Sequence, residues 1–595
     1  MKKVRNLNFL NTLYKVFLLI KPSKRKNLIY ILFCILATGV AEMITLASFV
    51  PFLIILSNPS EIYNLRFIGG FFNLFNISND NNIAYLISIV FAIAITFSGL
   101  LRLFNIWING RFSADIGSDL SNRLFEQILG RSYEKHINEN SSESINLLTL
   151  HINNVVGVFN SSLQIVSAFF ISVFIFFTLL FINFKVSLFA LISVLFLYLI
   201  IYKIVVNKLT KNSFLVSRNI KRQIQIIQET LGSIKDILLS NNQNRFLQDY
   251  LNYDKETRKK LALSNFLSLF PRVTIEFLAL LSLVSFSTVY IINSNNTNEL
   301  IIIIGTLAIA AQRLLPLCQQ IYYGLASINN NKSSIEKVIS SLNKNKIKGE
   351  LTYLKELKFE KYILLKDISF KYRNSKTKLL SNINLKIKKG ESIGIVGETD
   401  SGKTTLIDLI MGLLTPTAGH LIIDDIDLNQ KESADFIKSW QRKIAYVPQN
   451  IYLSDNNFEE NIAFSSFDGN IDPKRVKRVA EESVISEFID GSIKGYKTFI
   501  GERGLKISGG EKQRIGIARA LYKNHEVLVL DESTSAMDNA TEDLLMESLY
   551  KHKDEITLII VAHRLRTLKK CNKIIELKKG KIIWAGTSKE FFKKI

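Results

Sequence analysis

Long apolar stretches in the first half of this 595-residue chain constrain its fold more than any other feature of the sequence. A helix needs about 20 mostly apolar residues to cross a bilayer. Six stretches have that length and character: 28–56, 83–109, 155–182, 186–206, 263–292 and 299–327. The composition agrees, because 48% of the residues are hydrophobic and the mean hydropathy is +0.18. The sequence therefore predicts a membrane domain of six spanning helices.

The connections between these spans predict their orientation. Residues 110–154 and 207–262 are long connections rich in Lys and Arg, whereas 181–185 and 292–298 are short and nearly free of charge. Basic connections stay on the cytoplasmic side, so both termini and both long connections are expected there. Helical periodicity in the long connections predicts that the spans continue beyond the bilayer; the alternative is a polar loop with incidental periodicity.

The N-terminal residues 1–27 form an amphipathic stretch that ends in a basic cluster. We expect a helix lying on the cytoplasmic face of the membrane, not a cleaved signal peptide. The formal charge of +23 is spread along a Lys-rich chain, which favours a membrane surface over a nucleic-acid partner. Cys34, Cys318 and Cys571 lie far apart without C-x-x-C spacing, so neither a disulfide nor a metal site is expected.

From about residue 357 the pattern changes to short β-branched strands alternating with helices, which predicts an α/β domain. The strand ESIGIVG is followed by GETDSGKTT, in which Gly397, Gly402, Lys403 and Thr404 fit the phosphate loop G-x-x-x-x-G-K-[ST]. The helix that follows presents backbone amides at its start, which favours an anion.

Two further segments point to the same chemistry. Asp531 and Glu532 end the apolar strand EVLVLDE, where one acid can hold Mg²⁺ and the next can orient or deprotonate an attacking water. The alternative is that the pair merely ends a strand. In KISGGEKQRIGIARALY, Ser508, Gly509 and Gly510 lead into a helix and predict a second anion site.

With these motifs the chain resembles the ATP-binding cassette family. ISGGE is similar to the family signature LSGGQ, with Ile507 for Leu and Glu511 for Gln. Further matches occur in family order: Tyr372 as the adenine-stacking aromatic, Gln449 as the Q-loop, Asp538 as the D-loop and His563 as the switch histidine. Taken singly, Tyr372 is equally a half-buried strand aromatic and His563 a strand-end histidine.

The resemblance implies ATP and Mg²⁺ as cofactors, with Glu532 and His563 catalytic. It implies Mg²⁺ binding by Thr404, Gln449 and Asp531. The ATP-binding residues it implies are Tyr372, Gly397, Glu398, Thr399, Asp400, Ser401, Gly402, Lys403, Thr404, Thr405, Gln449, Ser508, Gly509 and Gly510.

Six spans followed by one cassette resemble a type I exporter half-transporter. The expected parts are an amphipathic segment at 1–27, a transmembrane domain at 28–335, a linker at 336–356 and the cassette at 357–595. The fold class is thus a six-helix α-helical transmembrane domain followed by an α/β P-loop domain. The family couples its two domains through the TFIGERG region and through short helices, here expected near 138–146 and 230–238, and works as a pair of chains, so a homodimer is expected.

Asp400 departs from the family, which usually has Gly at this position. The loop binds phosphate through its amides, and Asp tolerates unusual backbone angles and can point outward. Its charge should still weaken ATP binding, partly offset by Lys403 and Mg²⁺. We expect a working, weaker site; the alternative is a degenerate one, against which Glu532 and His563 argue.

Four ionisable residues lie at membrane depth: Glu42, Arg102, Arg272 and Arg313. Such residues are rare and mark function by default. Arg272 has Glu276 one turn on, so a local ion pair is an equal alternative. Arg102 and Arg313 either pair with Glu42 or face a water-filled cavity that attracts an anionic substrate, and we favour the cavity.

The membrane half, in AEMITLASFVPFL, GLLRLFNIW, LFPRVTIEFLAL and AAQRLLPLCQQI, resembles bacterial lipid-linked oligosaccharide flippases. This resemblance implies an anionic lipid-linked glycan as substrate, an inner-membrane location with a cytoplasmic cassette, and lipid contact by an interfacial helix at 61–77. The alternative is an exporter of drugs, peptides or other lipids, with peptide processing disfavoured because no peptidase domain precedes the spans. A soluble cassette protein of DNA repair or translation is excluded by the six spans.

Overall fold

The computed structural model describes residues 9–57, 80–182, 184–293, 297–344, 356–373, 375, 377–430, 434–466, 469–501, 504–551, 555–562 and 564–594. The chain divides into two compact units. One unit comprises residues 1–131 and 139–347, and the other comprises 132–138 and 348–595.

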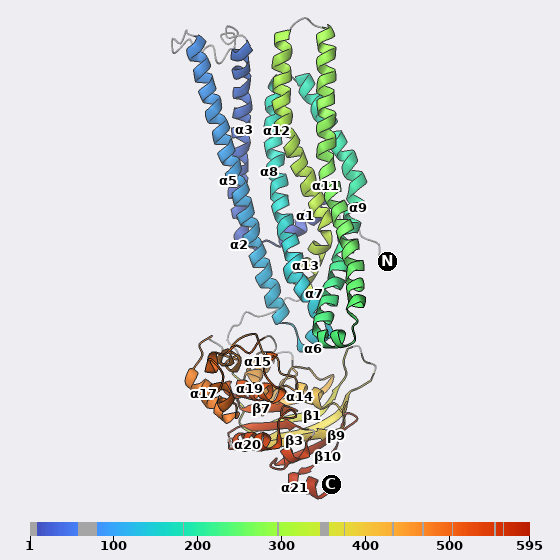
Figure 1. Cartoon of the computed structure of the whole chain (residues 1–595), viewed down its shortest axis with the longest axis vertical. Helices are drawn as coiled ribbons and strands as arrows, with labels where there is room; N and C mark the ends of the chain where they lie inside the picture. Colours follow the sequence, from blue (N-terminus) through green and yellow to red (C-terminus); the bar gives the residue numbers. More distant parts are fainter. Residues whose placement is uncertain are drawn as a thin grey trace. The chain divides into compact units, whose positions relative to one another are not determined.

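The first unit is helical, and its long helices run side by side (Figure 1). Its helices are α1 (Phe9–Leu18), α2 (Pro22–Arg25), α3 (Asn27–Ser57), α5 (Asp80–Leu129), α7 (Ser141–Asn146), α8 (Ile152–Ile182), α9 (Phe184–Gly232), α10 (Ile234–Leu239), α11 (Gln243–Asn293), α12 (Thr297–Asn330) and α13 (Lys332–Lys344). Helix α3 packs along α5, α8 along α12, and α9 along α11.

Each of the six expected spans lies within one of the long helices α3, α5, α8, α9, α11 and α12. Among the described residues, four segments are long and apolar enough to cross a membrane: Pro22–Ile55, Ile83–Leu129, Ser141–Phe181 and Gln243–Ser282. The expected interfacial helix at 61–77 lies outside the described residues.

The prediction that the spans continue as helices is confirmed. Helix α5 has 50 residues, α9 has 49 and α11 has 51. At a rise of 1.5 Å per residue such helices are about 75 Å long, well beyond the roughly 30 Å of a hydrocarbon core.

Short helices interrupt these extensions close to the expected positions. Helix α7 lies within the first expected range, 138–146, helix α6 (Tyr133–Asn138) ends at the start of that range, and α10 overlaps the second range. The residues of α6 group with the second unit, where Glu134 pairs with Arg373 at 3.7 Å. A π-helical turn at Leu147–His151 joins α7 to α8.

The expected linker 336–356 is helical over its first part, because α13 runs from Lys332 to Lys344. An apolar face stabilises α13 as a helix. Its residues Ile335 and Val338 are buried in the same cluster as Val16 of α1 and as Leu19 and Ile20, which follow α1. Residues 345–355 lie outside the described part of the chain.

The second unit is an α/β domain with two sheets. Its strands are β1 (Tyr362–Phe370), β2 (Leu380–Lys388), β3 (Ser392–Gly397), β4 (Ala418–Ile423), β5 (Ile426–Asp427), β6 (Ile444–Val447), β7 (Val527–Asp531), β8 (Thr557–Val561), β9 (Lys573–Lys578) and β10 (Lys581–Thr587). Its helices are α6, α14 (Lys403–Ile410), α15 (Ala434–Arg442), α16 (Phe458–Ile462), α17 (Pro473–Glu482), α18 (Ser486–Asp490), α19 (Gly509–Tyr522), α20 (Asn539–Tyr550) and α21 (Ser588–Lys594), with 3₁₀ turns at Gly495–Lys497 and Leu565–Leu568.

One sheet is antiparallel, in the order β2-β1-β4-β5, and the other has the order β10-β9-β3-β8-β7-β6. In the larger sheet β9, β3, β8, β7 and β6 are parallel. Strands β7 and β8 are buried along their whole length, because helices cover both faces of a parallel sheet. The exposed positions of β2 alternate with buried ones, as in a sheet with one wet face.

Candidate functional site

The sheet brings the cassette motifs to one edge. Strands β3, β8, β7 and β6 are adjacent and parallel, so their carboxyl ends lie together. The phosphate loop follows β3, Asp531 ends β7, and Gln449 lies two residues beyond β6. Open parallel sheets bind ligands at this edge. Motifs more than a hundred residues apart in sequence therefore form one site.

The phosphate loop leads from β3 into α14 as expected, with Gly402 at φ +100° before the first helical residue. A side chain at Gly402 would also meet Leu380 at 2.8 Å. Lys403 is 8% exposed and donates to the carbonyl oxygens of Gly397 (2.8 Å) and Glu398 (3.1 Å). The Lys403 ammonium group is thus held across the mouth of the loop, where a polyphosphate can accept from it.

Asp400 adopts a left-handed backbone conformation, with φ 62°, and its side chain is exposed. Asp and Asn enter this region more readily than other side chains because they bond locally through a short polar group. The expectation that Asp400 tolerates unusual angles and points outward agrees with this geometry. Ser401 beside it is 4% exposed, and its hydroxyl oxygen has no hydrogen-bond partner among the described residues.

Acidic and amide side chains meet next to the loop. Asp531 is 5% exposed and accepts from the Tyr446 hydroxyl at 3.3 Å. Gln449 donates from Nε2 to the Glu532 carboxylate at 2.6 Å. Glu532 itself has φ 50°, and its N–H donates to the Val561 carbonyl at 2.9 Å. The backbone therefore fixes where the Glu532 carboxylate emerges.

Asp408 of α14 is a member of this group that the motif search missed. Burial, then the nearby Asp531 carboxylate, raises the pKa of Asp408 to about 6. Burial, then Glu532, also raises the pKa of Asp531. The sequence did carry a signal, since Asp408 is an acid inside the otherwise apolar run LIDLIMGLL. Crowded buried carboxylates favour a cation as ligand.

The second anion site is built on the N-terminus of α19. Ser508 caps the helix and accepts from the Glu511 N–H at 3.3 Å, while Glu511 accepts from the Ser508 N–H at 2.7 Å. This reciprocal capping box explains an acid at position 511. A side chain at Gly510 would come within 3.1 Å of the Ala536 carbonyl oxygen, so the D-loop segment packs directly on the start of α19.

The remaining motif residues lie around these two sites. The Tyr372 ring packs edge-on against Phe370 with centroids 5.0 Å apart, and its hydroxyl lies 3.5 Å from Thr405 Oγ1. Asp538 caps α20 by accepting from the Thr541 N–H at 3.0 Å. Among the described residues, no hydrogen bond joins the phosphate loop to Ser508, Gly509 or Gly510. His563 lies outside the described residues.

The donor set fits ATP with Mg²⁺. The residues proposed for the metal, Thr404, Gln449 and Asp531, offer only oxygen ligands, which Mg²⁺ prefers. The unpartnered Ser401 hydroxyl and the Lys403 ammonium group suit the phosphate oxygens beside it. The described residues contain no cluster of three or more His, Cys, Asp or Glu that would hold a metal without the nucleotide.

In the helical unit the structure pairs Arg313 with Glu42. The Arg313 Nη1 donates to both carboxylate oxygens of Glu42, at 3.1 and 3.0 Å. Glu42 is 3% exposed, so the pair joins α3 to α12 inside the bundle. The expectation that Arg313 faces a cavity with a free charge is therefore wrong. Leaving the nearly buried Glu42 carboxylate without a partner would cost free energy, and which helix faces oppose each other is not visible in the sequence.

The other two arginines differ from Arg313. Arg272 lies 4.0 Å from Glu276, with both side chains more than half exposed, so this pair is weak. Arg102 has neither an ion pair nor a hydrogen bond to any described residue. It shares the polar face of α5 with Ser98, Asn105 and Asn109, which are at most 2% exposed.

A nucleotide site at the edge of an α/β sheet, joined to long membrane-spanning helices, defines the chain as an ATP-driven membrane transporter. The comparisons with known proteins name the family. A model described as ABC transporter matches residues 380–535, and one described as ABC transporter transmembrane region matches 28–314. The chain belongs to the ABC transporters, as an exporter-type half-transporter whose ATP hydrolysis is coupled to transport.

Several relatives and one solved structure agree with this family assignment. The Heterocyst differentiation ATP-binding protein HepA of Nostoc sp. is 28% identical over 82% of this chain and 81% of its own length. The ABC transporter B family member 29, chloroplastic, of Arabidopsis thaliana is 39% identical over 36% of this chain, which spans a third (33%) of that protein. A bacterial Atm1-family ABC exporter with ATP bound has a TM-score of 0.76 at 19% identity, with 96% of both chains covered, and shows the fold.

Proposed function

We propose that two copies of this chain bind ATP and Mg²⁺ between their cassettes and use its hydrolysis to move an amphiphile with an anionic head group across the bacterial inner membrane. The substrate class we propose is a lipid-linked oligosaccharide. The observation that carries the substrate class is Arg102, a cation on the polar face of a spanning helix with no ion-pair partner in the described part of the chain.

The cassette residues have distinct proposed roles. Lys403 binds the β- and γ-phosphates, and the loop amides position them. Glu532 orients and deprotonates the attacking water, and the 2.6 Å bond from Gln449 holds its carboxylate in place. His563 is proposed to contact the γ-phosphate. Bound Mg²⁺ would neutralise phosphate charge beside Asp531.

The need for two copies follows from the geometry proposed for ATP. The phosphate loop lies at the end of β3, whereas Ser508, Gly509 and Gly510 lie at the start of α19, and no hydrogen bond between described residues joins the two segments. A signature element from a second copy would complete the site, and a homodimer is the simplest such arrangement.

The free-energy cost of placing Arg102 in a spanning helix supports a substrate with an anionic head group. A cation in a spanning helix costs about 2.5 to 3.5 kcal/mol on insertion scales, so an unpaired one calls for a compensating partner. Glu42, the acid that could have served, is already bound to Arg313. An anionic substrate group would provide the missing charge.

Stimulated ATP hydrolysis tests this proposal. The purified chain is reconstituted in liposomes, and its ATPase rate is measured with a lipid-linked oligosaccharide and with the same polyprenyl tail lacking its head group. We expect stimulation by the first alone. Equal rates with both would contradict the proposed substrate class while leaving the ATPase intact.

A second candidate function is export of a toxin, drug or peptide. The names of two relatives favour it: the leukotoxin translocation ATP-binding protein LktB of Mannheimia haemolytica, 39% identical over 38% of this chain, and the putative multidrug export ATP-binding/permease protein YgaD of Bacillus subtilis, 37% identical over 38%. Stimulation by apolar cations in the same liposome assay would favour this function.

A further inference from the structure

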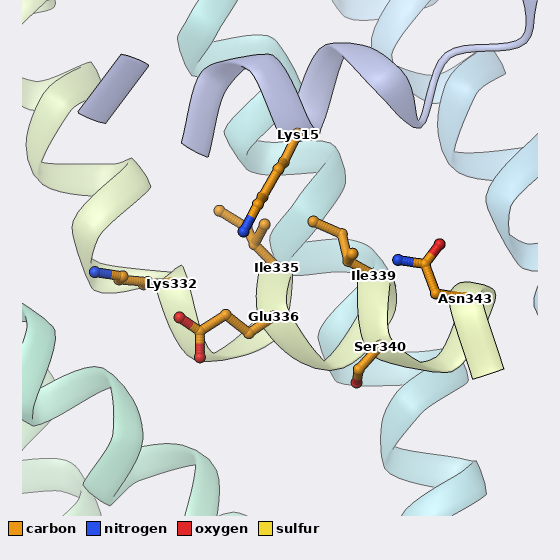
Figure 2. Close-up of a pocket in the computed structure, with 7 residues that line it drawn as sticks. All are labelled: Lys15, Lys332, Ile335, Glu336, Ile339, Ser340 and Asn343. Carbon is orange, nitrogen blue, oxygen red and sulfur yellow. The ribbon is translucent and has the colours of Figure 1, made fainter. Parts of the chain in front are cut away.

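A cavity of about 250 Å³ lies in the helical unit between α1 and α13 (Figure 2). Lys15 of α1 extends toward α13, whose Ile335 and Ile339 form apolar lining. Lys332 and Glu336, one turn apart on α13, add charge. Ser340 and Asn343 complete the lining.

Among the described residues, Lys15 and Lys332 have no ion-pair partner, unlike two nearby lysines. Lys21 and Lys24 both pair with Asp119, at 3.1 and 2.9 Å. Lys332 is 8% exposed, yet its ammonium group makes no ion pair or hydrogen bond with any described residue, not even with Glu336 four residues on. The Lys332 side chain is thus packed along most of its length while its ammonium group has no counter-charge among the described residues, so Lys332 marks a place for an anion.

With the orientation expected from the basic connections, the position of the cavity in the chain corresponds to the cytoplasmic surface of the bilayer. Helix α1 precedes the first spanning helix, α3, and α13 follows the end of the last, α12. The apolar contacts of α1 with Ile335 and Val338 fix α1 against α13. Phospholipid head groups lie at this depth.

We propose that this cavity binds the phosphodiester head group of an anionic inner-leaflet phospholipid, with Lys15 and Lys332 on the phosphate and Glu336 on hydroxyl donors of the head group. The three charges sum to one positive charge, which matches a phosphodiester better than a dianionic phosphate monoester. The volume is below the roughly 300–1,000 Å³ of sites that enclose a whole ligand, so the acyl chains remain outside, in the bilayer.

The cavity shares no lining residue with the sites proposed for substrate and ATP, so it does not depend on the function proposed above. Its occupant would hold α1 against the end of the last spanning helix. Lipid composition would then change the stability of the helical unit without changing the substrate.

Native mass spectrometry of the delipidated full-length protein tests the proposal. The probes are phosphatidylglycerol, phosphatidic acid, diacylglycerol and inorganic phosphate. We expect saturable binding of one phosphatidylglycerol molecule per chain and weaker binding of phosphatidic acid. Diacylglycerol should show no saturable binding, and excess inorganic phosphate should not displace the bound phosphatidylglycerol. Displacement by inorganic phosphate would overturn the lipid assignment in favour of a free anion.

Variants locate the binding. Lys15→Gln and Lys332→Gln should each weaken phosphatidylglycerol binding at least tenfold, whereas Lys208→Gln, at an exposed lysine of α9 near the membrane boundary, should not. Ser340→Trp should block the cavity with both lysines intact. Unchanged binding in Lys332→Gln and Ser340→Trp would overturn the site.

Thermal unfolding distinguishes a ligand site from a structural lysine. Lys332→Gln removes a charge that has no ion-pair partner among the described residues, so the lipid-free variant should be at least as stable as the parent protein. The rise in Tm that phosphatidylglycerol gives the parent protein should disappear in the variant. A retained rise would contradict the proposal.

Discussion

At the scale of single residues, two acids of the nucleotide site have left-handed backbone angles: Asp400 at φ 62° and Glu532 at φ 50°. The first could be anticipated, because an acid in a phosphate loop calls for a tolerant conformation. The second could not, because Glu has no such preference, and the sheet must impose the angle through the bond to Val561. Strain of this kind is typical of functional positions.

Substitutions at Asp400 distinguish the effect of its backbone conformation from the effect of its negative charge. Asp400→Asn keeps the conformation and removes the charge, so the KM for ATP should fall a fewfold. Asp400→Gly should lower it at least as far, since Gly adopts positive φ freely. Asp400→Ala should destabilise the cassette by about 1 kcal/mol through backbone strain. Steady-state ATPase and thermal unfolding check these outcomes, and an unchanged KM in Asp400→Asn would refute the repulsion.

Glu532→Gln tests the general base. The amide keeps the shape of the side chain but accepts no proton, so kcat should fall by about 10² to 10⁴ while ATP binding persists. Glu547→Gln, on the exposed side of α20, is the matched control and should retain normal turnover. Near-parental turnover in Glu532→Gln would falsify the assigned role.

At the scale of elements, hydrophobic length and charge predicted where the helices lie but not which faces meet. The pairing of Glu42 with Arg313 joins helices far apart in sequence, and periodicity along one helix cannot reveal its partner. The cassette was more predictable, because each motif has a fixed place at the end of a strand. Asp408 escaped notice because its environment comes from β7, over a hundred residues away.

Breaking the Glu42–Arg313 pair should cost stability. Arg313→Gln leaves the nearly buried Glu42 carboxylate without its charged partner, and the expected loss is about 3 kcal/mol. The double variant Glu42→Gln, Arg313→Gln should recover most of it. Thermal unfolding in detergent of Glu42→Gln, Arg313→Gln and the double variant completes the cycle, and additive single losses would show that the pair contributes nothing. Arg102→Ala should leave stability unchanged.

The buried His151 makes the stability of the helical unit depend on pH. Burial, then the Lys337 ammonium group, lowers the pKa of His151 to about 4. An unfolded His titrates near about 6.5, so between pH 6.5 and 4 only the unfolded chain gains the proton. Stability should therefore fall as the pH decreases through this window, by up to about 3 kcal/mol. His151→Gln should flatten the Tm profile there, and an unchanged slope would contradict the assignment.

At the scale of the whole molecule, the order of membrane helices and cassette was readable from apolar length and motif order, and both family matches agree. The identity of the substrate is harder to predict from the sequence, because its recognition depends on side chains brought together from several helices. If the working unit is a homodimer, mass measurement of the ATPase-active protein in nanodiscs should give two chains. An active monomer would contradict the proposed composite ATP site.

Translocation in proteoliposomes tests whether this chain moves a lipid-linked oligosaccharide at the expense of ATP. A fluorescent lipid-linked oligosaccharide is placed in both leaflets, and its access to an outside quencher is followed after ATP addition. We expect ATP-dependent movement by the parent protein, none by Glu532→Gln, and strongly reduced movement by Arg102→Ala with its ATPase intact. ATP-dependent movement that Arg102→Ala leaves unchanged, or no movement by an active ATPase, would contradict the proposed function.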